Sequence, residues 1–410
     1  MAIELSNITF TDQDDIVPSS GVEEIFNTGT ANTFAGNDII SGTGGGSSYG
    51  AGIHNELGII DTSNGDDTIS GIYNREVYYF FGYGIDNRQA TIDTGNGNDI
   101  ITGTVTNDGH GINNFNSIID TGDGDDIITG FTPNGTAIIS YRTIIDTGKG
   151  NDIITGIAFS GISLSFSTLN TGDGNDIITG GTGDIPISRT NGTGISILTS
   201  MIDTGDGDDI ITGTNALGYG IHNRGNIITG DGHDIITGIG DIFRGGLYNE
   251  GTINSGNGND SIISQEKLSN LGGVFLGDGD DSIIVSGGPD GPGNGYSIYN
   301  EGTINTGNGN DSIITDKGFY TTSRYSSGSI FLGEGEDYIK GAGGGDFYGG
   351  NGNDTLELTP GSYTVEIWDT SAIFTKGSQR MITSEFEKLK AGGTTYDFTS
   401  LTAGQIIIVA

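Results

Sequence analysis

The sequence predicts an all-β protein, a parallel β-solenoid in which short strands stack coil upon coil. The first observation is an internal repeat. The phrase TGNGNDIITG at residues 94–103 returns along the chain, and an Asp occupies the same place in thirteen copies. The second is that two further short apolar phrases recur between the copies. The third is that no long stretch has the 3.6-residue periodicity of a helix. A unit of about 27 residues with three short strands fits one solenoid coil, whose apolar face is buried only when coils stack.

Residues 1–33 form a polar lead-in. One alternating segment, residues 3–10, predicts a first strand or an end cap. The first eight residues lack a basic segment followed by an apolar core, so we expect no cleavable signal peptide. Since no run of about 18 apolar residues occurs, we also expect no transmembrane segment.

The repeat region covers residues 34–357. Successive copies of the Asp lie 21 to 33 residues apart up to Asp337. A Gly stands two places before the Asp in all thirteen copies and four places before it in eleven. Between copies, β-branched phrases bounded by Gly, Asn and Asp predict strands of three to five residues. Some are Gly-Ile-x-Asn phrases such as 84–87, and others centre on an apolar residue before the loop, such as Ile119. Loops such as 72–84 and 180–194 are expected to absorb differences in coil length.

Alternation along the strand after each loop predicts which side chains face the core. Ile101 should point inward, and Ile100 and Thr102 outward. The Ile101 column stays apolar to Leu356, whereas Ser replaces Ile in the Ile100 column from Ser261. Six successive copies nevertheless present an outward Ile, and such a strip is either a contact surface or is covered by the chain's own loops. The six are Ile100, Ile127, Ile153, Ile177, Ile210 and Ile235.

The spacing changes near the end of the repeat region. Asp337, Asp346 and Asp354 lie nine and eight residues apart, which leaves no room for the intervening strands of a full coil. Residues 358–410 then lose the repeat. Segments such as 363–368 and 405–410 alternate or are apolar, and they predict a small antiparallel β cap.

Composition limits the function classes. The net charge of −38 would repel phosphates, which argues against a nucleic-acid partner. The chain has no Cys, so disulfides do not hold it together. It has 77 Gly but only 6 Pro, which does not fit a collagen or a Pro-rich linker. The acids concentrate in one short loop per repeat, and carboxylates in Gly-rich loops are typical of a site for a hard cation.

The chemistry of the loop follows from its residue types. Gly permits φ > 0 and lets carbonyl oxygens turn toward one point, while the Asp adds a charged oxygen. Six or more oxygens suit Ca²⁺, whereas Mg²⁺ demands stricter geometry and keeps its waters. With no Cys and four His, a soft-metal site is not expected. The alternative is a metal-free turn in which the Asp accepts from a backbone N–H. A column of carboxylates at about 4.8 Å intervals would repel itself without cations.

We therefore expect multiple Ca²⁺ ions and a chain that folds when calcium is supplied. The predicted ligands are the Asp and, in most copies, the two preceding Gly residues of each loop. They are Asp38; Asp67; Gly95, Gly97, Asp99; Gly122, Gly124, Asp126; Gly148, Gly150, Asp152; Gly172, Gly174, Asp176; Gly205, Gly207, Asp209; Gly230, Gly232, Asp234; Gly256, Gly258, Asp260; Gly277, Gly279, Asp281; Gly307, Gly309, Asp311; Gly333, Gly335, Asp337; Asp346; and Gly350, Gly352, Asp354.

Residues 349–357 match the nonapeptide Gly-Gly-x-Gly-x-Asp-x-U-x, in which U is a large apolar residue. In this the chain resembles the RTX, or haemolysin-type calcium-binding, repeats. The tandem block 333–357 looks like a turn of their parallel β-roll. The other copies carry Thr or another residue in place of the first Gly, and one loop per long coil suggests a single calcium column. The resemblance covers most of residues 34–357. It implies export by type I secretion with an uncleaved C-terminal signal, to which the apolar run 406–410 is similar.

The leading prediction is a secreted, calcium-stabilised structural protein of the cell surface or extracellular matrix that assembles with itself. The outward Ile strip and an uncapped N-terminal end would provide the contacts. The alternative is a binding module, an adhesin for cell-surface glycans or an ice-binding solenoid, that uses the flat Ile/Thr face.

An enzyme is not expected, although β-solenoids include polysaccharide lyases. Repeats fill the chain and leave no separate catalytic domain. The four His residues look isolated in the sequence, and four Arg residues could line a sugar groove. These are His54, His110, His222 and His233, and Arg75, Arg88, Arg224 and Arg244.

Overall fold

The computed structural model describes residues 2–18, 23–44, 50–74, 81–181, 192–287, 295–321 and 328–410. In these ranges the chain is almost entirely β, with two 3₁₀ turns, η1 (Leu5–Asn7) and η2 (Phe398–Ser400). None of their helices is long and apolar enough to cross a membrane. Contacts divide the chain into two units, residues 1–226 and 227–410, with the boundary inside β23 (Tyr219–Ile228). The predicted loops 72–84 and 180–194 and Arg75 lie partly or wholly outside the described residues.

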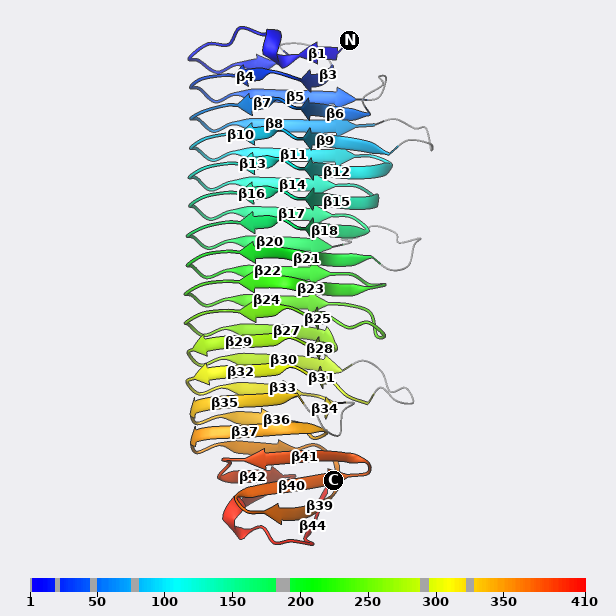
Figure 1. Ribbon diagram of the computed structural model, residues 1–410, viewed down its shortest axis with the longest axis vertical. Coiled ribbons are helices and arrows are strands. Elements are labelled where there is room, and N and C mark those ends of the chain that lie inside the picture. Colours follow the sequence, from blue (N-terminus) through cyan, green and yellow to red (C-terminus); the bar gives the residue numbers. More distant parts are fainter. Residues whose placement is uncertain are drawn as a thin grey trace. The chain divides into compact units, whose positions relative to one another are not determined.

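The first unit is a stack of coils with three strands each (Figure 1), and equivalent strands of successive coils pair in parallel and in register. We call the three sets of strands faces; the first set forms one sheet, and the other two sets belong to a second sheet. The strands after the Gly–Asp loops form the first face: β2 (Ile16–Val17), β5 (Ile39–Gly44), β8 (Thr68–Tyr73), β11 (Ile100–Val105), β14 (Ile127–Phe131), β17 (Ile153–Ile157), β20 (Ile177–Gly181) and β22 (Ile210–Thr214).

The second face follows in each coil, and the third face leads into the next loop. The second face contains β3 (Glu24–Asn27), β6 (Ala51–Glu56), β9 (Gly82–Arg88), β12 (Asp108–Phe115), β15 (Asn134–Tyr141) and β18 (Ser160–Ser165). The third contains β4 (Thr30–Asn32), β7 (Ile59–Asp61), β10 (Thr91–Asp93), β13 (Ile118–Asp120), β16 (Ile144–Asp146) and β19 (Thr168–Asn170). The long strand β21 (Thr193–Asp203) pairs with both β18 and β19. The lead-in contributes β1 (Ala2–Glu4), which pairs in parallel with β3.

The second unit repeats this arrangement. Its first face contains β24 (Ile235–Ile239), β27 (Ser261–Glu266), β30 (Ser282–Gly287), β33 (Ser312–Thr315), β36 (Tyr338–Lys340), β38 (Thr355–Leu358) and β42 (Lys388–Ala391). Its second contains β25 (Leu247–Asn249), β28 (Leu268–Asn270), β31 (Ile298–Asn300) and β34 (Phe319–Tyr320). Its third contains β26 (Thr252–Asn254), β29 (Gly273–Asp278), β32 (Thr303–Asn308), β35 (Ser329–Gly335), β37 (Gly345–Gly352) and β41 (Gln379–Ser384).

The chain ends in antiparallel pairs. β39 (Gly361–Trp368) pairs with β40 (Ser371–Lys376) and β44 (Ile406–Val409), β40 pairs with β41, and β42 pairs with β43 (Thr394–Asp397). Between Asp337 and Asp354 the prediction of no intervening strands was wrong. β36 and β37 lie there, because a coil shortened to 17 residues still keeps two of its three sides.

The predicted facing of the first-face strands is confirmed. The residues of the Ile101 column are at most 1% exposed, from Ile101 itself to Leu356. Ile100, Ile153 and Ile177 point outward and are 36–39% exposed, so other parts of the chain do not cover the strip. The parallel β-solenoid predicted from the repeat is therefore the fold of the chain.

The Gly-Ile-x-Asn phrase has a second role that its reading as a strand did not reveal. Its Asn is fully buried at the end of the second face, and the side chains form a ladder along the stack. Asn55 Nδ2 donates to Asn87 Oδ1 at 2.9 Å, and Asn87 Nδ2 donates to Asn114 Oδ1 at 2.9 Å and to the Ile118 carbonyl at 3.0 Å. The second unit has the same ladder at Asn249, Asn270 and Asn300. Because each amide binds both neighbouring coils, the ladder fixes their register.

Substitution Asn87→Ala should lower the free energy of unfolding by about 3 kcal/mol, since it leaves buried partners on two coils without hydrogen bonds. Urea unfolding followed by circular dichroism measures this loss. Asn98→Ala is the matched control, because Asn98 also accepts from the next coil, at 2.9 Å, but lies exposed to water. Equal losses in the two variants would contradict a register-fixing role for the buried ladder.

Candidate functional site

The Gly–Asp loops connect the third face of one coil to the first face of the next. In most coils that carry both loop glycines, the stacking leaves no room for a Cβ at either. Gly150 has φ +149°, and a Cβ built on it would lie 1.7 Å from the Gly124 carbonyl oxygen of the preceding coil. A Cβ built on Gly148 would likewise lie only 2.0 Å from the Gly122 carbonyl oxygen. The glycine carbonyls therefore form rows that point along the stack toward the next loop.

The motif Asp, meaning the Asp of each repeat, turns inward rather than toward solvent. All thirteen are at most 2% exposed. In eleven of them, Oδ1 accepts the backbone N–H of the motif Asp in the preceding coil, and Asp38 Oδ1 accepts from Asp15 N. For example, Asp99 N donates to Asp126 Oδ1 and Asp126 N to Asp152 Oδ1, both at 2.8 Å. In the second unit the ladder ends where Asp354 N donates to Glu387 Oε2 at 2.7 Å. The Asp–backbone hydrogen bond, which the metal-free alternative anticipated, is therefore present for Oδ1.

The second oxygen of the motif Asp, Oδ2, differs between coils. In two coils the Thr five residues earlier donates to Oδ2: Thr147 Oγ1 donates to Asp152 Oδ2 at 2.6 Å, and Thr33 Oγ1 donates to Asp38 Oδ2. In three coils of the second unit that Thr is replaced by Leu276, Leu332 or Gly349. The corresponding Oδ2 atoms are buried and have no hydrogen-bond partner. They belong to Asp281, Asp337 and Asp354, and the Oδ2 atoms of Asp99, Asp126 and Asp176, whose coils keep the Thr, are likewise buried with no partner at hydrogen-bond geometry.

Burial makes the charged form of these carboxylates costly. Loss of solvation raises the pKa of Asp99, Asp126 and Asp176 to about 7, against the pull of the Thr hydroxyl and the backbone N–H. The pKa of Asp281 and of Asp337 is also raised to about 7 by burial, and neighbouring Asp carboxylates add to the shift. Among the described residues, no Lys or Arg is a cause of these pKa shifts.

The structure brings the thirteen motif Asp residues and their glycines into columns, within each unit, as the repeat predicted. It sets Asp346 apart, because Asp346 lies on β37 opposite Ser329, on the third face. Within the described ranges no three acidic or His side chains converge as metal ligands. The fit to a cation rests instead on the unpartnered buried Oδ2 atoms and the rows of glycine carbonyls, and the individual ligand assignments stay predictions.

A second acidic row was missed in the sequence. The Asp that precedes the Thr of each loop in the first unit points outward at the end of the third face, and its row comprises Asp61, Asp93, Asp120, Asp146 and Asp203, with Asn170 in the same register. Burial and the charges of Asp120 and Asp61 raise the pKa of Asp93. The signal was present in the phrase D-T-G, which recurs at 93–95, 120–122 and 146–148.

The first face of the first unit presents two parallel rows to solvent. One is the exposed Ile row, and the other is a row of half-buried hydroxyl side chains two residues further along each strand: Ser41, Ser70, Thr102, Thr129, Thr155, Thr179 and Thr212. Neighbouring coils are about 4.8 Å apart and the two rows about 6.6 Å apart. The face is therefore a flat, regular grid of methyl and hydroxyl groups.

One expectation about the histidines was wrong. His54 is not isolated, because its Nδ1 lies 3.0 Å from Asp86 Oδ2 on the second face. Asp86 also binds Arg88 Nε at 2.7 Å and Asn113 Nδ2 at 2.6 Å. Against the effect of burial, His54, Arg88 and Asn113 lower the pKa of Asp86, and Asp86 and Glu56 raise the pKa of His54. The group is a buried ion-pair network that the coil stacking assembles from three coils.

Comparison with known proteins adds one distant likeness. It is to the X-ray crystal structure of a hyperactive, Ca²⁺-dependent, beta-helical antifreeze protein from an Antarctic bacterium, with 18% sequence identity, a TM-score of 0.40, and coverage of 81% of this chain and 84% of that chain. No family model matches the chain, and a search of curated proteins gave no match. The resemblance to RTX repeats therefore stays a prediction, and the functional argument rests on the geometry of the site.

Gly150→Ala should destabilise the calcium-supplied protein by about 3 kcal/mol, because the new methyl meets a backbone carbonyl that the stacked coils hold in place. Gly393→Ala serves as the control, since no atom lies within 4 Å of a Cβ at that position. Urea unfolding compares the two variants. A near-neutral Gly150→Ala would mean that the loops are not stacked in solution as closely as described.

Without divalent metal, stability should fall as the pH rises. The motif Asp pKa values are raised above the unfolded value, so the folded chain binds more protons between about pH 4 and about pH 7 and is favoured at the acidic end. Urea unfolding in EDTA at a series of pH values measures this slope.

Asp281→Asn should reduce that slope, because it removes a carboxylate whose pKa is raised to about 7. Asp125→Asn is the matched control, because Asp125 is exposed and hydrogen bonds from Asn151 lower its pKa. A slope that both variants leave unchanged would count against the buried column as its source.

Proposed function

We propose that the chain is a calcium-binding β-solenoid whose folded state depends on the bound ions. The observation that carries the proposal is the set of buried motif Asp carboxylates, one per coil, whose raised pKa values owe nothing to a Lys or Arg of the described residues. Bound Ca²⁺ would supply positive charge, and oxygen-rich loops are the environment that this ion prefers. Because the loops take this shape only in stacked coils, metal affinity and folding share one free energy.

The residues that would hold the ions are the motif Asp side chains and the carbonyls of the loop glycines. The strongest candidates are the adjacent coils of Asp337 and Asp354, where both Oδ2 atoms are buried and unpartnered. Glu385 and Glu387 add negative charge there and raise the pKa of Asp354. This region is also the block that matches the RTX nonapeptide.

We further propose that the protein is a non-enzymatic structural component of the cell surface or extracellular matrix, exported by type I secretion and assembled through its first face. The exposed Ile row supports this part of the proposal, because it repeats an apolar contact at every coil and a second copy could match it along its length. His54 pairs with Asp86 in a structural network rather than with a nucleophile.

The regularity of the first face favours a second candidate, a binding module for ice or for a glycan. Both ligands are themselves periodic, and a rigid grid of Ile and Thr side chains loses little conformational entropy on binding. The two candidates use the same face but differ in what covers it.

Calcium dependence is tested by circular dichroism and calorimetric titration of the whole chain after treatment with EGTA. Above about pH 7, where the motif Asp carboxylates are charged, we expect the β spectrum to be lost without calcium and to return cooperatively when calcium is added. Asp337→Asn should weaken calcium binding, whereas Asp369→Asn, in the hairpin between β39 and β40, should leave it unchanged. A circular dichroism spectrum that EGTA leaves unchanged would contradict the calcium proposal.

The role of the first face is tested in calcium with the double substitution Ile153→Lys and Ile177→Lys. Assembly through this face predicts that wild-type filaments or sheets, seen by electron microscopy and light scattering, disappear in the variant. Thermal hysteresis, or its loss in the variant, would instead favour ice binding. A monomeric wild type that shows no hysteresis would contradict both assembly and ice binding through the face.

A further inference from the structure

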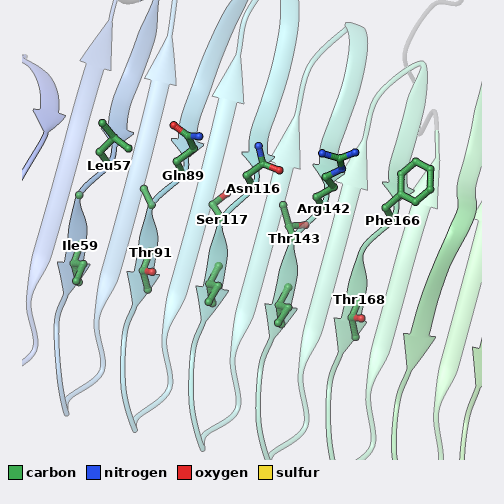
Figure 2. A pocket seen from close by; sticks show the side chains of 14 residues that line it. Leu57, Ile59, Gln89, Thr91, Asn116, Ser117, Arg142, Thr143, Phe166 and Thr168 are labelled. Carbon is green, nitrogen blue, oxygen red and sulfur yellow. The ribbon is translucent and has the colours of Figure 1, made fainter.

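A shallow groove runs along the first unit, on the corner between its second and third faces. It has a volume of about 570 Å³ (Figure 2). One wall consists of corner residues with left-handed backbone, among them Gln89, Asn116, Arg142 and Phe166, with φ from +49° to +56°. The other wall is the outward residue of each third-face strand, such as Thr91 and Ile118. A second stretch continues from Phe166 to Asn226 and passes Arg224.

The groove exists because the residue between the two walls is small in every coil. This floor position is Gly58, Ala90, Ser117, Thr143, Ser167, Ser200 and Gly225 in turn. The floor hydroxyls bind within the protein: Ser117 Oγ donates to Asn114 Oδ1 at 2.6 Å, and Ser200 Oγ to the Leu198 carbonyl at 2.8 Å. At about 4.8 Å per coil, seven coils make a groove of about 30 Å.

The charge of the groove is opposite to that of the chain. The net charge of the protein is −38, yet neither stretch of the groove is lined by a carboxylate, and the two charged residues that line it are Arg142 and Arg224. The Arg142 guanidinium stacks over the Tyr141 ring at 5.2 Å, which holds its plane in place. An oriented guanidinium fork suits a carboxylate better than a flexible Lys would.

An apolar platform lies beside this cation. The Phe166 side chain is 52% exposed, and its ring meets the edge of Tyr141 at 5.9 Å. Tyr141 in turn stacks on Phe115 at 5.3 Å. An exposed, rigid aromatic ring beside hydroxyl and amide groups is the mixed lining that binding sites use for ligands with both apolar and polar faces.

The backbone of the groove is not available to a peptide strand. Thr91 N donates to the Gly58 carbonyl at 3.0 Å, Ile118 N to the Ala90 carbonyl at 3.0 Å, and Thr168 N to the Thr143 carbonyl at 3.0 Å. The floor carbonyls are therefore already used between coils, which disfavours addition of a β-strand. A repetitive polymer, by contrast, can make the same kind of contact at each coil.

We propose that this groove binds an extended polysaccharide that carries carboxylates. Arg142 pairs with a uronate carboxylate, Phe166 packs against the face of a sugar ring, and Gln89, Asn116 and Thr91 offer hydrogen bonds to hydroxyls. The acidic row of Asp93, Asp120 and Asp146 borders the Ile/Thr wall and confines such a ligand to the groove. The site is separate from the first face and does not require assembly.

The test measures binding of a hyaluronan oligosaccharide to the whole chain by calorimetry, in calcium and at low ionic strength. An oligosaccharide of N-acetylglucosamine is the uncharged comparison. The substitutions are Arg142→Gln and Phe166→Asn, because the chain itself carries Gln89 and Asn116 at the equivalent left-handed positions. The matched control is Arg380→Gln, since Arg380 stacks on Trp368 at 4.8 Å in the C-terminal hairpins and is remote from the groove in sequence.

We expect hyaluronan to bind, the uncharged oligosaccharide to bind much more weakly, and Arg142→Gln and Phe166→Asn each to weaken hyaluronan about tenfold. Arg380→Gln should bind as the wild type does. No binding of hyaluronan, equal binding of the uncharged oligosaccharide, or equal losses in Arg142→Gln and Arg380→Gln would overturn the proposal. Circular dichroism confirms that each variant is folded, so a failure here is distinguishable from a failure of the calcium proposal.

Discussion

The structure depends on one constraint, the parallel, in-register stacking of coils about 4.8 Å apart. Under this constraint a residue does not act alone, because its equivalents in the next coils lie directly beside it. An apolar position becomes a continuous core, as in the Ile101 column, and an amide becomes a ladder, as at Asn55, Asn87 and Asn114. Any polar group that is unfavourable in one coil is unfavourable in all of them. A buried polar side chain that recurs along the stack therefore needs a partner in each coil.

The motif Asp is where this requirement is most demanding. A single buried carboxylate with one backbone hydrogen bond is tolerable, but a column of them accumulates desolvation and like-charge repulsion. A Thr hydroxyl relieves part of this cost at Asp38 and Asp152, and no Thr occupies that place at Asp281, Asp337 and Asp354. A cation would relieve the remainder, which is why the calcium proposal follows from the stacking as well as from the residue types. It would also link the stability of the whole stack to the supply of the ion.

Outside the core, the same stacking turns each side of a coil into a surface with its own chemistry. The first face presents Ile and Thr rows, the loops present acids and amides, and the corner between the second and third faces of the first unit presents an acid-free groove. These surfaces are separated by only a few residues in each coil. A chain with a net charge of −38 can therefore still carry a local site with cationic character.

The sequence by itself determined the solenoid and the stacking of the Gly–Asp loops, because both follow from the periodicity of the repeat. It also determined that Ile101 points inward and Ile100 outward, because side chains alternate along a strand. It could not reveal that the motif Asp turns inward to bind the preceding coil, or that Asp346 lies outside the column. Both depend on which residues the coil register places side by side. The network of His54, Asp86 and Asn113 and the groove at Arg142 were likewise invisible, since each joins residues that are more than 20 positions apart in the chain. Only the tertiary structure decides such contacts, because coil lengths vary and the register between coils is set by packing and hydrogen bonds rather than by spacing.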